Sequence, residues 1–82
     1  MNNFNEEVEF TVMYEEDKAE GNVSAYIPAL RLGVSGDTLE EARENAKDLI
    51  AMELQKAQKQ KRSLPPETSI IEKIKVNALV IQ

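Results

Sequence analysis

The stretch that decides the fold is residues 36–42, which read Gly-Asp-Thr-Leu-Glu-Glu-Ala and open a long run without glycine or proline. Thr38 is a good N-cap, because its hydroxyl can accept a hydrogen bond from an unpaired amide in the first helical turn. Glu41, three residues later, can return a bond to the Thr38 amide and complete a capping box. The sequence therefore predicts a helix over about residues 38–60.

This helix carries one apolar stripe, and its charges suit the helix dipole. Apolar residues recur at steps of three and four, which is typical of a helix that packs one of its faces against the rest of the protein. Acidic residues are concentrated in the first turn and basic residues in the last. Both groups interact favourably with the helix dipole and stabilise the helix. The stripe consists of Leu39, Ala42, Ala46, Leu49, Ile50, Leu54 and Ala57.

Composition indicates one small domain, residues 1–82, with a thin core. There is no cysteine, so neither a disulfide framework nor a thiolate metal site is expected. Nothing in the sequence resembles a signal peptide or a membrane span, and we expect a cytoplasmic protein without a membrane partner. The formal net charge is −5. An acidic chain is not expected to bind nucleic acid, because neutralising phosphates requires a basic face.

Alternating apolar and polar residues predict four strands around the helix. They cover about residues 7–15, 22–27 and 31–35 before the helix and about 70–81 after it, while residues 1–6 are polar and expected to be frayed. Pro28 should end the second strand, because it has no amide to donate. Pro65 and Pro66 prevent the helix from continuing. The predicted order is β-β-β-α-β, an α+β fold with one helix packed on one face of a four-stranded sheet.

One helix covers only one face of such a sheet, so the other face is predicted to be open. That face should be mostly polar, with Met13, Tyr26, Leu79 and Ile81 as apolar exceptions. Exposed apolar groups on a thin domain favour a contact surface, for another copy of the chain or for a partner. The alternative is that Leu79 and Ile81 tuck under a local loop.

Three parts of the chain form one recognisable pattern: an acidic hairpin with Glu15-Glu16-Asp17 and Gly21, a strand end with Ala25-Tyr26-Ile27-Pro28 and Leu30, and a helix start with Gly36-Asp37-Thr38, Glu40-Glu41-Ala42, Asn45 and Leu49-Ile50. Over about residues 8–55 this pattern resembles the HicB-like antitoxin family. This resemblance implies a reduced ribonuclease H-like fold, in which the last strand pairs with the first in a mixed sheet. It also implies homo-dimers or homo-tetramers and, as partner, a HicA-like toxin, a small basic mRNA-cleaving protein.

The chain departs from the family pattern in two places. The stretch between Leu30 and Gly36 is one residue shorter than the family's usual loop. No DNA-binding module follows the predicted fourth strand, so operator binding is not expected. The acidic Glu15, Glu16 and Asp17 remain the natural electrostatic complement to a basic ribonuclease.

Catalysis is not expected from this composition. There is no histidine, which removes the usual general base and any histidine-based metal site. A two-metal nuclease site would need several acidic side chains that converge on one point. Glu9 and Glu15 instead lie on the solvent-facing side of the predicted first strand, and Glu41 is used in the capping box. We therefore predict no catalytic residue, no metal and no cofactor. The basic run over residues 56–62 is interpreted as a solvated helix end, with a nucleic-acid contact as the alternative.

The sequence thus favours a non-catalytic protein-binding module, a HicB-like antitoxin that neutralises a small basic ribonuclease by direct contact. The alternative is a homo-oligomeric domain with a different partner, which binds protein or peptide through a sheet edge or the exposed sheet face.

Overall fold

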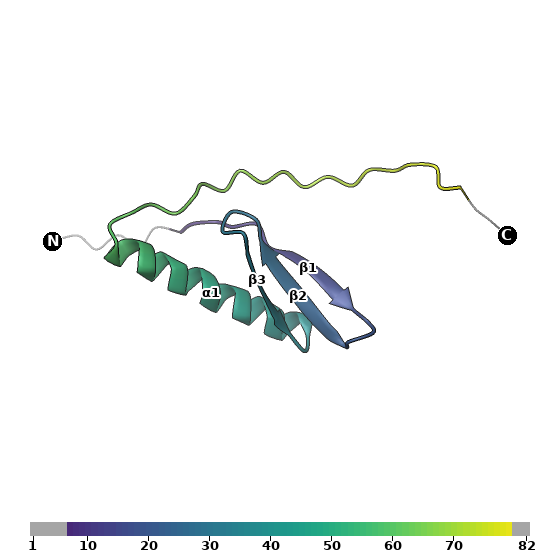
Figure 1. Ribbon diagram of the computed structural model, residues 1–82, viewed down its shortest axis with the longest axis horizontal. Helices are drawn as coiled ribbons and strands as arrows, with labels where there is room; N and C mark the ends of the chain where they lie inside the picture. The colour runs from purple at the N-terminus through teal and green to yellow at the C-terminus, as the bar shows by residue number, and fades with distance from the viewer. Residues whose placement is uncertain (1–6, 80–82) are drawn as a thin grey trace.

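The structure, a computed structural model, describes residues 7–79. Strands β1 (Met13–Asp17), β2 (Asn22–Ile27) and β3 (Leu32–Gly36) form an antiparallel sheet in the order β1-β2-β3. Helix α1 (Leu39–Lys59) covers one face of this sheet (Figure 1). The described residues therefore form an α+β unit with the order β-β-β-α.

The first strand is shorter than predicted, because its neighbour ends. The pairing of β1 with β2 begins at Met13 opposite Tyr26, and β2 ends one residue later at Ile27. Pro28 follows and has no amide for a ladder, so residues 7–12 lead into the sheet without a strand partner. The second and third strands match the prediction to within one residue. Residues 1–6, predicted to be frayed, lie outside the described residues.

The predicted fourth strand over residues 70–81 is not formed in residues 70–79, and residues 80 and 81 lie outside the described range. Residues 70–79, hereafter the arm, form an extended segment that passes the sheet along the long axis of the molecule (Figure 1). Every residue of the arm is exposed, including Ile70 at 92% and Leu79 at 88%. A strand requires a neighbour for its backbone hydrogen bonds, and the arm has none among the described residues.

The N-cap prediction is confirmed, with one difference in detail. The hydroxyl oxygen of Thr38 accepts a hydrogen bond of 3.0 Å from the amide of Glu41. The returning bond goes one residue further back than predicted, because the carboxylate of Glu41 accepts from the amide of Asp37 at 2.8 Å. The Thr38 hydroxyl and the Glu41 carboxylate thus each satisfy one amide at the helix start.

The other end of α1 closes with a Schellman motif. The Arg62 amide donates to the Ala57 carbonyl at 2.9 Å, and the Lys61 amide donates to the Gln58 carbonyl at 3.2 Å. Lys61 takes the left-handed conformation, with φ of 54°. The helix therefore ends before the prolines, and the chain leaves it in a fixed direction.

The core lies between β2 and the first half of α1. Val23, Ala25 and Ile27 are buried on the covered face of the sheet, opposite the buried Ala42 and Ala46 of the helix. Alanines at these positions let the helix approach the sheet closely. Leu54 of the predicted stripe is more exposed, because a helix of 21 residues runs about 31 Å whereas strands of this length span under about 20 Å. Packed against the core are Phe10, Val12, Leu30, Val34, Leu49 and Ile50.

Candidate functional site

The acidic hairpin, defined here as Glu15, Glu16 and Asp17 with the turn to Glu20, is exposed throughout. Within residues 7–79 the two ion pairs both lie on α1, between Lys47 and Glu44 and between Lys56 and Glu53. The hairpin carboxylates therefore have no basic partner within the described part of the chain. They form a concentrated negative surface at one end of the sheet.

The turn of this hairpin is well defined. One carboxylate oxygen of Asp17 accepts hydrogen bonds from the amides of Ala19 and Glu20, each of 3.1 Å. The Gly21 amide donates to the Asp17 carbonyl at 2.7 Å, and Gly21 has φ of 74°, a conformation that glycine adopts without steric cost. The carboxylate of Asp17 thus holds the turn, while those of Glu15, Glu16 and Glu20 are left to solvent.

The face of the sheet away from α1 carries two of the four predicted contact residues. Met13 and Tyr26 are cross-strand neighbours, and each is 43% exposed. With Tyr14, Glu15 and Ser24 they line an open hollow of about 340 Å³. An apolar pair beside an acidic strand is a surface that a protein partner could cover.

The structure does not bring Leu79 to this face. Leu79 belongs to the arm and is 88% exposed, so the alternative in which it tucks under a local loop is wrong. Ile81 lies outside the described residues. Met13 and Tyr26 therefore form one surface, and the arm forms another.

In the described part of the chain the outer edge of β1 is open, because β1 pairs with β2 on one side and is the last strand of the sheet on the other. On the covered face, the guanidinium carbon of Arg43 lies 5.9 Å from the centre of the Tyr14 ring. This distance is within reach of a cation–π interaction. The open edge is thus bordered by an acidic strand and by one basic side chain of the helix.

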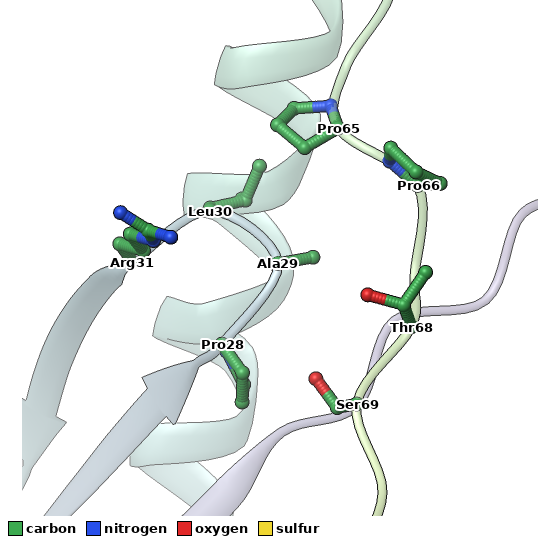
Figure 2. A pocket seen from close by; sticks show the side chains of 8 residues that line it. All are labelled: Pro28, Ala29, Leu30, Arg31, Pro65, Pro66, Thr68 and Ser69. Carbon is green, nitrogen blue, oxygen red and sulfur yellow. The ribbon is translucent and has the colours of Figure 1, made fainter.

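A second hollow lies where the chain leaves the helix. The β2–β3 turn, residues 28–31, faces residues 65–69 across a space of about 430 Å³ (Figure 2). Figure 2 shows the hydroxyls of Thr68 and Ser69 pointing towards this turn. Arg31 holds the turn in a left-handed conformation, with φ of 55°. The hollow separates residues 67–69, hereafter the root of the arm, from the end of the sheet.

Glu67 anchors the root of the arm, a role that the sequence interpretation missed. One of its carboxylate oxygens accepts from the Thr11 amide and the other from the Ser69 amide, both at 2.7 Å. These two backbone hydrogen bonds hold the pKa of the Glu67 carboxyl below its ordinary value, the bond from Thr11 having the larger effect. Thr11 is 56 positions away in sequence, so no local pattern indicated this contact.

Comparison of the chain with protein-family models, with curated proteins and with solved structures gave no match. The HicB-like interpretation therefore remains a prediction that depends on the motif residues alone.

Neither a metal site nor a membrane-spanning helix is present within residues 7–79. Among residues 7–79, no group of three or more histidine, cysteine or acidic side chains has a geometry that could hold a metal ion. Glu9, Glu15 and Glu41 are therefore not brought together. Helix α1, the helix of this region, is not apolar enough to span a bilayer.

Acidification should release the root of the arm. A carboxyl whose folded-state pKa is lowered stabilises the fold above its unfolded pKa, and that contribution is lost as the pH falls through the folded value. We expect the protection of the Thr11 amide against hydrogen exchange to fall between pH 7 and pH 3, after correction for intrinsic exchange rates. Amide exchange followed by NMR measures this change.

The matched control is Glu67→Gln, which cannot titrate and keeps one acceptor oxygen. In this variant the Thr11 protection should be lower at pH 7 and should vary less with pH. An unchanged wild-type protection factor across the range would show that Glu67 does not hold the segment before β1.

Proposed function

We propose that this chain is a non-catalytic protein-binding module, a HicB-like antitoxin that neutralises a small basic ribonuclease toxin by direct contact. The observation that carries the proposal is the acidic hairpin. Its carboxylates are exposed and have no internal basic partner within residues 7–79. A basic protein is the partner whose charge complements this surface.

Charge of this kind acts mainly on the rate of encounter. A cluster of like charges on one end of a domain steers an oppositely charged partner and raises the association rate, an effect that salt screens. The hairpin is also pre-ordered, since Asp17 and Gly21 fix its turn through backbone hydrogen bonds. Binding on a pre-ordered surface loses less conformational entropy.

The proposal extends to the fold. Residues 70–81 would add a fourth strand along the open edge of β1 and complete the reduced ribonuclease H-like, mixed sheet that the resemblance implies. The alternation in the arm supports this, because Ile74, Val76 and Ala78 share one side and Lys73, Lys75 and Asn77 the other.

A second candidate function is favoured by the open sheet. A homo-oligomeric domain could bind protein or peptide through the edge of β1 or through the hollow beside Met13 and Tyr26. This function requires no toxin and no acidic hairpin. The two candidates are therefore separated by changing the hairpin charge while leaving the sheet intact.

The deciding experiment is co-expression with a small, basic, histidine-containing protein encoded beside this gene. We expect the chain to restore growth that this toxin arrests. Glu16→Lys with Glu20→Lys, at two exposed hairpin positions, should weaken binding at least tenfold, mainly through a slower association measured by surface plasmon resonance, and should lose the rescue.

The matched control is Glu44→Lys with Asp48→Lys. It makes the same change in net charge at exposed positions of α1, where breaking the Lys47–Glu44 pair costs under about 1 kcal/mol. This control should still rescue growth. Failure of the folded wild-type chain to rescue, or equal rescue by the hairpin variant, would refute the proposed contact.

A further inference from the structure

We infer that the arm of one copy of this chain completes the sheet of a second copy along the outer edge of β1, and that the exchange is reciprocal. The inference rests on the fourth strand proposed above and is independent of any toxin. It is carried by the exposed apolar arm, the open edge, the projecting geometry of the arm, and the charges on the two segments.

The arm has the composition of a buried strand, yet it is fully exposed. Its β-branched residues Ile70, Ile71, Ile74 and Val76 are between 64% and 92% exposed. Such residues fit a pleated, half-buried surface. An exposed apolar segment of this length indicates an interaction site, because soluble monomers rarely leave so many neighbouring large apolar groups in water.

The edge of β1 is the complementary surface. Its outer backbone groups have no strand partner among residues 7–79, because β1 is the last strand of the sheet that these residues form. An unpaired edge is a template on which another extended segment can add backbone hydrogen bonds. Tyr14, on the covered face, is 38% exposed at this edge, where an added strand would cover it.

The root of the arm is fixed beside the segment that enters β1, and the arm continues past its own sheet. The root is held by Glu67, and Pro65 and Pro66 restrict the backbone just before it. Beyond Ser69 the arm projects past the domain (Figure 1). The radius of gyration is 16.9 Å, whereas a compact chain of this length would have about 12 Å. The arm is therefore placed to meet a second molecule.

Charges on the two segments are complementary. Met13, Glu15 and Asp17 alternate on the open face of β1, while Tyr14 and Glu16 share the covered face with the buried Ala25 and Val23. If Ile74 and Val76 turn towards the covered face, Lys73 and Lys75 fall on the open face beside these acids. One arrangement thus satisfies both the apolar and the charged side chains.

A second copy is the occupant that the chain itself supplies. In a reciprocal exchange each copy donates one arm and receives one, so both edges and both arms are covered at once. Such swapping is a low-cost route to dimers, because it uses the contacts that a closed monomer would make. The assembly is closed, with no edge of β1 left to recruit a third chain.

The test uses the full chain without a toxin. Sedimentation equilibrium should give twice the monomer mass of 9.2 kDa. A sample mixed from labelled and unlabelled chains should show NMR contacts between residues 70–79 of one copy and Met13–Asp17 of the other. A monomer would overturn the inference, as would a dimer in which the arm contacts β1 of its own chain.

Variants give an independent measurement. Ile74→Lys with Val76→Lys should raise the dissociation constant of the dimer at least a hundredfold and leave a folded monomer by circular dichroism, since both side chains are exposed within one copy. The matched control, Leu39→Lys with Met52→Lys, changes two exposed apolar residues of α1 and should leave the dissociation constant unchanged. Equal weakening by both pairs would show non-specific association and refute the exchange.

The outcome is also separable from the proposed function. A wild-type chain that is monomeric yet still rescues growth would refute the exchange alone. A dimer with arm–β1 contacts between copies but no rescue would leave the exchange standing and refute the antitoxin role.

Discussion

Gly36→Ala should lower the free energy of unfolding by about 3 kcal/mol, the upper end of the range for overpacking a tight site. Gly36 is the buried last residue of β3, directly before the helix start. A Cβ added there would lie 2.5 Å from the Ala42 amide nitrogen and 2.9 Å from both the carbonyl carbon and the Cβ of Glu41. These are mainly backbone contacts, so the first turn of α1 would have to move away from the sheet.

That movement would break further contacts. The side-chain amide of Asn45 donates to the Ser35 carbonyl at 2.8 Å and ties the helix to β3 beside Gly36. Buried Ala42 is in the same first turns and would leave its place opposite β2. Urea denaturation followed by circular dichroism measures the loss as a lower midpoint with an unchanged slope.

Gly33→Ala is the graded control for this prediction. Its added Cβ would lie 3.1 Å from the Ala25 carbonyl oxygen, and the site is exposed. Replacing glycine in a strand also recovers roughly 0.5–1 kcal/mol of backbone entropy, which offsets the tight contact. We expect a change near zero. A Gly36→Ala variant as stable as this control would show that the helix start is not packed on β3.

Local signals in the sequence predicted the helix and its place on the sheet. The hydroxyl of Thr38 caps the first turn as expected, and Ala42 and Ala46 of the stripe are buried. Both signals depend on residues within a few positions of one another. The close approach of Gly36 to Ala42 could not be predicted in the same way, because it depends on where the helix packs.

The fourth strand shows where local pattern is insufficient. Residues 70–81 have the alternation and the β-branched residues of a strand, and this indicates only that the segment suits a sheet. A strand also requires a neighbour, and no pattern within the segment identifies one. The start of β1 was predicted wrongly for the same reason. Its first pair, at Met13, depends on where Pro28 ends β2.

The candidate site divides in the same way. The exposure of Glu15, Glu16 and Asp17 follows from turn chemistry and alternation. Alternation also places Met13 and Tyr26 on the same face, whereas their pairing depends on the strand register. The contact between Glu67 and Thr11 spans 56 positions and could not be read from either segment. One signal was present, since Glu67 is the one acidic residue between positions 54 and 71.

Ile27→Ala should have the largest effect on stability, a loss of about 4 kcal/mol within the range for removing a buried isoleucine side chain. Ile27 is 0% exposed and is the largest fully buried side chain of residues 7–79. A domain of 82 residues has a total stability of roughly 4–12 kcal/mol. The variant should therefore be largely unfolded in mild urea, as measured by circular dichroism and by collapse of NMR amide dispersion.

The size of this loss follows from what surrounds the side chain. The buried helix residues of the core cluster are Ala42 and Ala46, whose methyl groups are too short to move into the space that Ile27 would vacate. The strand register fixes the backbone on both sides, since Ile27 pairs with Leu32 and its neighbour Tyr26 pairs with Met13. The cavity would therefore persist, and its cost adds to the lost transfer free energy of the side chain.

Ile27→Val, which removes one methylene group, should lose only about 1 kcal/mol. Tyr26→Ala, at a neighbouring position on the open face, should lose less than Ile27→Ala because its side chain is 43% exposed and lies outside the core. If instead Tyr26→Ala were the more damaging change, the open face would be a buried face in solution. The core would then lie on both sides of the sheet, and the surface assigned to Met13 and Tyr26 would already be covered.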